Sequence, residues 1–415
     1  MAASSELVNP GRIAFTYPDF LSYQVARFCI VTSLEMLSVA VGWQVYDITH
    51  RALDLGLVGL AQFLPGIFLF LASGHAADRF DRRRLLMLCY AGFAVCSGLL
   101  LAVSWFRAAS VYPIYAVLVL LGIVRSFNGP VSRSLLPQLV PEQHFPNAVA
   151  WNSSIFQTAT ILGPAVGGLV YAFFKGASPV YAAAFAVSLA AVVSTFRIRL
   201  RTKPPPREEV SWTTVLAGFR YIWVQKIILA SISLDMFAVL LGGSVALLPV
   251  YAREILHTGP WGLGLLRSAP AVGAAAMAIV LAHRPLRRHV GQTMLWCVAG
   301  FGVFTIIFAV SRSIVLSMIA LFLVGASDMV SVIIRGTLVQ LGTPNSMRGR
   351  VNAVDMLFIG VSNEFGEFES GVTAHWFGTV PAVLIGGIGT LVVIAIWAGI
   401  FPELRKAEEI TSVRS

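Results

Sequence analysis

The sequence predicts an all-α membrane protein with about twelve transmembrane helices arranged in two halves. Three observations support this prediction: the composition, a series of long apolar runs and an internal repeat. The chain of 415 residues is 57% hydrophobic and only 12% charged, and its mean hydropathy is +0.78. A soluble domain of this length does not need so much apolar surface, so the composition indicates a protein that crosses a membrane many times.

The apolar runs are each near or above the ~20 residues that a helix needs to cross a bilayer core. Short islands of charge separate them. Lys and Arg are concentrated in every second connection, which indicates that both termini are cytoplasmic, because positive residues are retained on that side. In chain order the runs lie at 20–46, 55–74, 85–106, 112–136, 148–174, 179–198, 226–250, 261–282, 291–311, 314–338, 350–376 and 380–401.

One connection, Ser194–Arg220, is much longer than the others. Its run Pro204–Pro206 stiffens the chain and excludes helix. After it, Trp212–Trp223 is expected to form a short amphipathic helix on the membrane surface. The resulting division is a cytoplasmic N-terminal segment at 1–19, a six-helix bundle at 20–198, a cytoplasmic linker at 199–225, a second six-helix bundle at 226–401 and a cytoplasmic tail at 402–415.

Two short patterns of the first half recur in the second half. Arg-x-x-Leu-x-Gln-Leu at 133–139 returns at 335–341, and Asn-Ala-Val at 147–149 returns at 352–354. An ordered series of matches across two connections predicts that the two halves are structurally related repeats.

The charged island Gly74–Arg84 reads GHAADRFDRRR and lies between two uncharged runs. We expect it to form a short cytoplasmic loop. It resembles the loop between helices 2 and 3 of the major facilitator superfamily, whose pattern is G-x-x-x-D-R-x-G-R-R, although Asp81 stands where the family often has Gly. The resemblance implies a gating loop around a central cavity, and a simple positive-inside loop is the alternative. The matching residues are Gly74, Asp78, Arg79, Arg82 and Arg83.

The run at 148–174 contains the pattern A-x-x-x-G-P-x-x-G-G at 159–168. It resembles the antiporter motif of the same superfamily, G-x-x-x-G-P-x-x-G-G, with Ala159 in place of the first Gly. Small residues permit close helix packing and proline permits a kink, so ordinary packing is the alternative. The resemblance implies a patch that closes one side of the cavity in exporters that exchange substrate for protons. Its residues are Gly163, Pro164, Gly167 and Gly168.

Ionisable residues within the runs are costly in hydrocarbon, so they are expected to face a cavity or a partner. Glu35 lies midway along the first run, on the same helical face as Arg27, and could bind a proton reversibly. Arg125 heads an R-x-x-x-G pattern that resembles the superfamily's fourth helix, where the Arg is associated with proton transfer. Asp235 and Asp328 are the candidates of the second half. A structural ion pair or a snorkelling side chain is the alternative for each.

The run at 350–376 contains three carboxylates within about two helical turns. Glu364 and Glu367 share a face with Gly371, whereas Glu369 points elsewhere. Three carboxylates cannot all be ionised in lipid, so some are expected to be solvated by a cavity, paired with Arg or protonated. They indicate a proton or cation relay or a substrate wall, and a helix end in external water is the alternative.

Several other classes of protein are not indicated. The net charge of +10 lies in islands between apolar runs, not on a basic face for nucleic acid. The cysteines and histidines show no metal-ligand spacing, and no Gly-rich phosphate loop is present. We therefore expect no cofactor and no metal, with a proton gradient as the energy source, and no enzyme activity.

The resemblance covers essentially the whole chain and is nearest to the branch of the enterobactin exporter and macrolide-efflux proteins. It implies a multi-pass protein of the bacterial inner membrane that exports a small amphipathic molecule, a siderophore or drug-like compound, in exchange for protons. We expect contact with membrane lipids and a monomeric state. A lysophospholipid transporter, or a membrane receptor or scaffold that does not transport, is the alternative.

Overall fold

The computed structural model describes residues 10–106, 110–199, 212–284 and 289–405. Within these ranges the chain is almost entirely helical and contains no strand. Eleven of the described helical segments are long and apolar enough to cross a membrane. A twelfth, α13 (Asn345–Phe377), packs among them but carries the carboxylates of its run. The prediction of an all-α membrane protein is confirmed.

The first half consists of six long helices preceded by a 3-10 turn, Pro10–Thr16. Their bounds agree closely with the apolar runs, because each run is long enough to cross a bilayer and ends near a charged residue, Gly or Pro. They are α1 (Pro18–Thr49), α2 (Ala52–Arg79), α3 (Arg82–Trp105), α4 (Tyr112–Leu135), α5 (Phe145–Phe174) and α6 (Ala177–Phe196).

The second half follows α7 (Trp212–Val224), a short helix that packs against α13. The helix expected at Trp212–Trp223 is therefore present. The remaining long helices are α8 (Lys226–Leu241), α10 (Gly259–His283), α11 (Val290–Val310), α12 (Ile314–Gly342), α13 and α14 (Thr379–Ile400), followed by the short α15 (Pro402–Arg405).

The run at 226–250 lies within a candidate membrane span, Lys226–Ile255, as predicted, but it is not one continuous helix. After α8 the chain passes through Gly242 and Gly243 into a 3-10 turn (Ser244–Leu247), the short α9 (Leu248–Val250) and a π-helical turn (Tyr251–Ile255). The glycines allow close approach: a Cβ on Gly242 would lie 2.4 Å from the Phe301 ring, and one on Gly243 would lie 2.9 Å from the Gly366 carbonyl carbon. Two adjacent glycines also favour a helix end.

The charged island Gly74–Arg84 forms a shorter loop than predicted. Only Phe80 and Asp81 lie outside helices, because α2 extends to Arg79 and α3 begins at Arg82. The Asp81 carboxylate accepts a hydrogen bond of 2.9 Å from the Arg84 backbone N–H and so caps α3. The residue that departs from the superfamily's Gly therefore has a local structural role.

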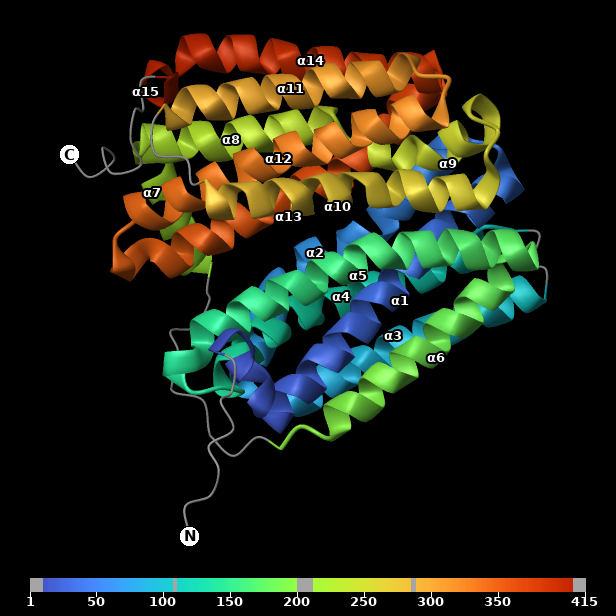
Figure 1. The fold of residues 1–415 in the computed structure, drawn as a ribbon, viewed down its shortest axis with the longest axis horizontal. Coiled ribbons are helices and arrows are strands. Elements are labelled where there is room, and N and C mark those ends of the chain that lie inside the picture. Colours follow the sequence, from blue (N-terminus) through green and yellow to red (C-terminus); the bar gives the residue numbers. More distant parts are fainter. Residues whose placement is uncertain (1–9, 107–109, 200–211, 285–288, 406–415) are drawn as a thin grey trace.

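The two halves lie side by side, with α8, α10, α11, α12 and α14 on one side and α1, α3, α4, α5 and α6 on the other (Figure 1). They meet where α5 packs against α10 and α2 packs against α13. Both contacts depend on glycine pairs. A Cβ on Gly168 would lie 2.9 Å from the Gly264 Cα, and one on Gly371 would lie 2.7 Å from the Gly56 Cα.

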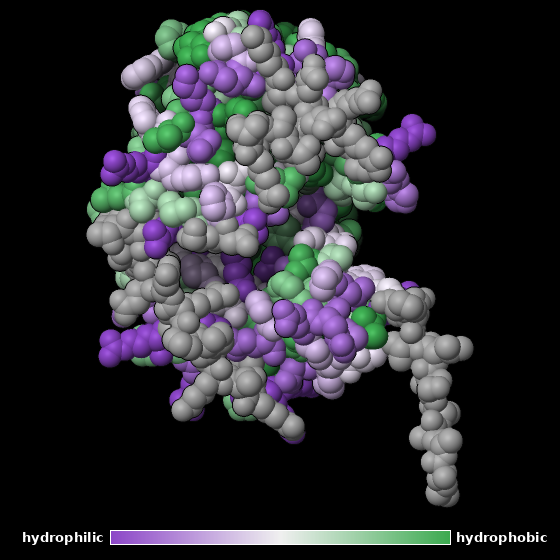
Figure 2. All heavy atoms as spheres, turned by 90° about the vertical axis from the view of Figure 1, so that its left-hand side faces the viewer, coloured by the Kyte–Doolittle hydropathy of each residue, from purple (hydrophilic) through white to green (hydrophobic). Residues whose placement is uncertain are grey.

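These glycine contacts lie toward one end of the bundle, where α1 ends and α2 begins; we call this the closed end. At the opposite end α1 begins and α15 lies (Figure 1), and we call it the open end. Viewed from that end, the surface is hollowed between the halves and hydrophilic residues surround the hollow (Figure 2).

Candidate functional site

A central cavity of about 640 Å³ lies between the two halves. Helices α1, α2, α4 and α5 supply most of its wall, and α10 and α13 supply Arg267, Glu364 and Glu367 from the second half. The lining contains four arginines and three glutamates. Such a density of charge in a membrane protein marks a water-filled binding site rather than a lipid-facing surface.

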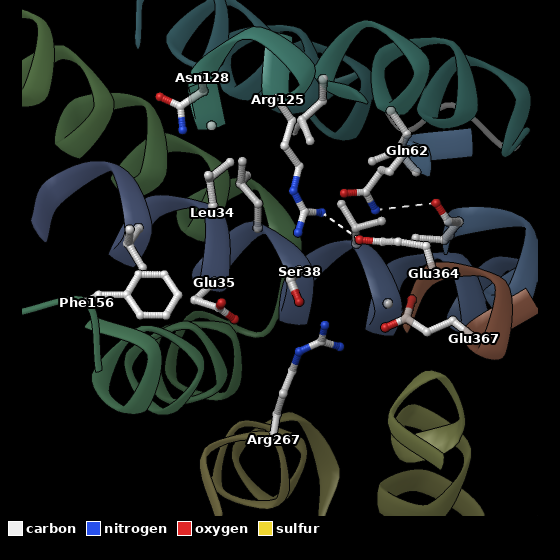
Figure 3. A pocket seen from close by; sticks show the side chains of 18 of the residues that line it. Leu34, Glu35, Ser38, Gln62, Arg125, Asn128, Phe156, Arg267, Glu364 and Glu367 are labelled. Carbon is white, nitrogen blue, oxygen red and sulfur yellow. Dashed lines mark hydrogen bonds and ion pairs between the residues drawn. The ribbon is translucent and has the colours of Figure 1, made fainter. Parts of the chain in front are cut away.

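An ion pair crosses the cavity from one half to the other. Arg125 Nη1 of α4 lies 3.1 Å from Glu364 Oε1 of α13 (Figure 3). Both residues were expected from the sequence to be functional candidates, but nothing in the sequence indicated that they are partners. Because the pair joins the two halves, its strength depends on how the halves are placed relative to each other.

Two further carboxylates, Glu35 of α1 and Glu367 of α13, point into the same space (Figure 3). Arg267 of α10 extends into the cavity near both of them. Arg267 and Arg125 interact electrostatically with each of these carboxylates. Three carboxylates therefore share two guanidinium groups, and one more positive charge or one proton would balance the cluster.

Glycines hold these two carboxylates in place. A Cβ on Gly163 would lie 2.5 Å from the Glu35 Cβ, and a Cβ on Gly59 would lie 2.9 Å from Glu367 Oε2. The antiporter-like motif therefore packs directly behind Glu35. Its other glycines, Gly167 and Gly168, face Met36 of α1 and Gly264 of α10, and Pro164 is buried within α5.

Glu364 and Glu367 line the cavity as their shared face predicts, several turns before α13 ends at Phe377. They do not lie at a helix end. Glu369 points elsewhere and accepts a hydrogen bond of 2.6 Å from Thr373 Oγ1 within its own helix.

Asp235 and Asp328 do not line the central cavity. They lie inside the second half, next to a small void. Arg335 joins the group, with Nη2 at 3.3 Å from Asp235 Oδ2 and Nη1 at 2.6 Å from Asp355 Oδ1. Ser331 Oγ donates to Asp235 at 3.3 Å. We call Asp235, Asp328, Arg335 and Asp355 the buried network.

The residues expected to form a gating loop lie at the open end. Arg82 is buried and donates to the Ser134 carbonyl of α4 at 3.2 Å, which ties α3 to α4. Arg83 lies over the Phe196 ring of α6 at 5.5 Å. Gly74 belongs to α2 and Arg79 is exposed at its last turn, whereas the Asp78 side chain is outside the described part of the chain.

The sequence analysis missed several of these residues. Arg267 and Asp355 are ionisable residues within apolar runs, so the reasoning that selected Glu35 could have found them. It also missed the closed end, where Arg253 pairs with Asp47 and the Tyr46 hydroxyl donates to Glu254. These contacts join α1 to the π-helical turn of the second half.

The described residues contain no group of three or more His, Cys, Asp and Glu side chains suited to a metal ion.

A twelve-helix bundle of two halves around a central cavity is the architecture of major facilitator transporters. Three solved structures share it. The nucleoside transporter NupG has a TM-score of 0.66 and 15% identity, over 92% of this chain and 99% of that chain. A bacterial homolog of the human lysosomal transporter Spinster has a TM-score of 0.70 and 13% identity, over 95% of this chain and 97% of that chain, and the D-xylose-proton symporter has a TM-score of 0.67 and 15% identity, over 92% and 97% of the two chains. At these identities the likeness establishes the fold.

The chain belongs to the family described as transmembrane secretion effector, which matches residues 21–415. The enterobactin exporter EntS of Shigella boydii serotype 4 (strain Sb227) is 25% identical over 399 residues, which cover 94% of each chain. EntS of Escherichia coli O1:K1 / APEC is 26% identical over 404 residues, again 94% of each. The protein is therefore a multi-pass membrane transporter and not an enzyme.

Proposed function

We propose that this protein is a proton-coupled exporter of a small amphipathic molecule, working by alternating access in the bacterial inner membrane with both termini in the cytoplasm. The observation that carries the proposal is the cluster of Glu35, Glu364 and Glu367 with Arg125 and Arg267 at the interface between the halves. The kinship with enterobactin exporters supports export and a siderophore-like substrate.

In this orientation the open end faces the cytoplasm, so the structure corresponds to the inward-facing state that receives substrate. Residues 200–211 of the linker expected at 199–225 lie outside the described residues, and α7 follows them. The closed end is sealed by the α5–α10 and α2–α13 contacts, whose glycines allow backbone-to-backbone approach. Release to the outside requires these contacts to separate while the open end closes.

The proton enters through the shared carboxylates. When the closed end opens, external protons reach Glu35 or Glu367. A protonated carboxyl group is neutral, so its electrostatic attraction to Arg267 is lost. Glu364 remains ionised in this step and keeps its attraction to Arg125, a contact between the halves that is present in the inward-facing state. The protonated cluster favours return to the inward-facing state, where the proton leaves and substrate binds again.

The other motifs act around this cluster. The antiporter-like glycines allow α5 to pack closely against α1 and α10. The same motif therefore contributes to the packing of the closed end and contacts Glu35. The loop between α2 and α3, with Arg82 fixed on α4, moves with its half at the cytoplasmic mouth.

The test is proton flux into proteoliposomes that contain the purified protein and a pH-sensitive dye, under an imposed pH gradient. Catecholate siderophores, macrolides and lysolipids are added in turn to wild type and to Glu35→Gln. A compound that triggers flux in wild type but not in the variant supports the proposal. Wild-type flux in Glu35→Gln contradicts the role of Glu35, and lysolipid movement without proton flux contradicts proton-coupled export.

A further inference from the structure

Two arginines of the central cavity, Arg27 of α1 and Arg133 of α4, take no part in the carboxylate cluster. Both line the cavity. Each lies eight residues nearer the open end than the cluster residue of its own helix, Glu35 or Arg125, which is roughly 12 Å along a helix axis. They are therefore met first by a molecule that enters from the open end.

Both arginines lie close to Ser132. Arg27 Nη1 donates to Ser132 Oγ at 3.0 Å, and Arg133 is the next residue in the chain. The two positive charges repel each other, and Arg133 also contacts Met356 Sδ of α13. In the described part of the chain neither arginine has a carboxylate within ion-pair distance, and Arg27 Nε is buried with no hydrogen-bond partner.

Comparison with the second half shows that Arg133 lacks the acidic partners of its counterpart. Arg335 occupies the position of Arg133 in the second half, and it is neutralised by Asp235 and Asp355. Asp355 directly follows the repeated Asn-Ala-Val triplet, whereas Ala150 follows it in the first half.

The residue that the first helix of each half places beside this arginine also differs in charge between the halves. The first spanning helix of the second half, α8, places Asp235 beside Arg335, whereas the first helix of the first half, α1, places Arg27 beside Arg133. The first half thus has alanine at the position of Asp355, and an arginine rather than an acid lies near Arg133. Two unpaired guanidinium groups remain, and they face the cavity instead of a bundle interior.

An aromatic surface lies next to this pair. Arg27 Cζ is 5.4 Å from the centre of the Phe156 ring, and Phe156 also lines the cavity with 42% of its surface exposed. The Arg27 guanidinium over the Phe156 ring, with Arg133 nearby, is suited to binding a planar aromatic acid. The acidic group of such a molecule can bind both arginines while its aromatic ring packs on Phe156.

We propose that Arg27 and Arg133 bind the acidic group of an amphipathic aromatic anion, and that such anions are the substrate class of this transporter. The inference rests on the proposed function, because it identifies the substrate of the same cavity. It also accounts for the excess of one arginine over the glutamates among the lining residues.

The test uses the full-length protein in nanodiscs, without any pH gradient, and two probes of nearly the same shape: 2-naphthoate and neutral 2-naphthamide. Binding is measured by isothermal titration calorimetry. In wild type we expect naphthoate to bind about tenfold or more tightly than naphthamide, with a preference that weakens as salt is added. In Arg27→Gln/Arg133→Gln the preference is lost, while naphthamide binding changes by less than about threefold.

Two variants serve as controls. Arg27→Lys/Arg133→Lys keeps the positive charges and is expected to retain most of the preference, and Arg220→Gln removes an exposed arginine of α7 and is expected to leave it unchanged. Size-exclusion profiles show that each variant is folded, and single Arg133→Gln replaces the double variant if that one aggregates.

Equal affinity of wild type for the two probes, or no binding of naphthoate, overturns the proposal. So does a preference that survives the glutamine substitutions. Because binding is measured without a gradient, such a failure leaves the proton-flux experiment to decide the proposed function by itself.

Discussion

The described part of the protein contains two clusters with three carboxylates each, and their surroundings differ. In the central cavity, Glu35, Glu364 and Glu367 come from both halves and share the cavity with Arg125 and Arg267. In the buried network, Arg335 pairs with Asp235 and Asp355, and Asp328 lies beside Asp235, all within the second half. An ion pair between the halves changes whenever they move, whereas a pair within one half stays fixed. The first cluster is therefore suited to coupling and the second to holding a bundle together.

The largest expected effect comes from removing Arg335. Its side chain is only 5% exposed, and Arg335→Met would leave buried aspartates without a positive partner. We expect a loss of about 3–5 kcal/mol in the free energy of unfolding, seen as a marked fall in Tm by tryptophan fluorescence in detergent.

The matched change in the cavity is Arg125→Met. The Arg125 side chain is 53% exposed, so its loss should cost ~1 kcal/mol or less. Equal falls in Tm for the two variants would remove the distinction between the clusters.

The next effect in size concerns the seal of the closed end. Gly168→Val would place a Cβ 2.6 Å from the Pro260 carbonyl oxygen, so α5 and α10 could not pack as they do here. We expect overpacking of about 1–3 kcal/mol against the inward-facing state, and hence a shift toward a state open at the other end. Spin-label distances across the closed end measure the shift. Gly399→Ala is the control, since a Cβ there meets nothing within 4 Å, and unchanged distances in Gly168→Val would contradict the assignment of this seal.

A further variant tests whether the ion pair between the halves responds to protons. Glu364→Gln carries no charge at any pH, so the distance between α4 and α13 at the open end should lose most of the pH dependence seen in wild type. Glu369→Gln, which alters a carboxylate bound to Thr373 in its own helix, should keep it. A wild-type pH response in Glu364→Gln would show that other groups carry it.

The smallest effect is expected at the exposed ion pair of the closed end. Asp47→Asn removes a partner of Arg253, and both side chains are partly exposed, at 51% and 31%. Its contribution to stability should be below about 1 kcal/mol, because solvent screens such pairs. A fall in Tm as large as that of Arg335→Met would mean that the Asp47–Arg253 ion pair contributes much more to stability than its exposure indicates.

The fold could be predicted from the sequence almost completely, because the length and apolar character of each run determine a spanning helix. The span at 226–250 was predicted, but not its interruption after α8, where Gly242 and Gly243 follow Leu241. Composition marked this segment as apolar, but the break depends on the close approach of Phe301 and Gly366, which only the packed structure reveals.

The site could be predicted only in part. An ionisable residue in an apolar run stands out, which is why Glu35, Arg125 and Glu364 were found. Whether such a residue faces the cavity or the interior of its own half depends on helix rotation and on partners far away in the chain. The sequence therefore did not separate Asp235 and Asp328 from the cavity residues, nor indicate that Arg125 pairs with Glu364.

The central claim is that the carboxylates between the halves, and not those of the buried network, carry the proton. The most direct measurement compares substrate-driven proton flux in proteoliposomes for Glu367→Gln and Asp328→Asn, each corrected for the amount of folded protein. We predict that Glu367→Gln abolishes the flux and that Asp328→Asn retains it. Flux that persists in Glu367→Gln and disappears in Asp328→Asn would contradict the claim and assign coupling to the buried network.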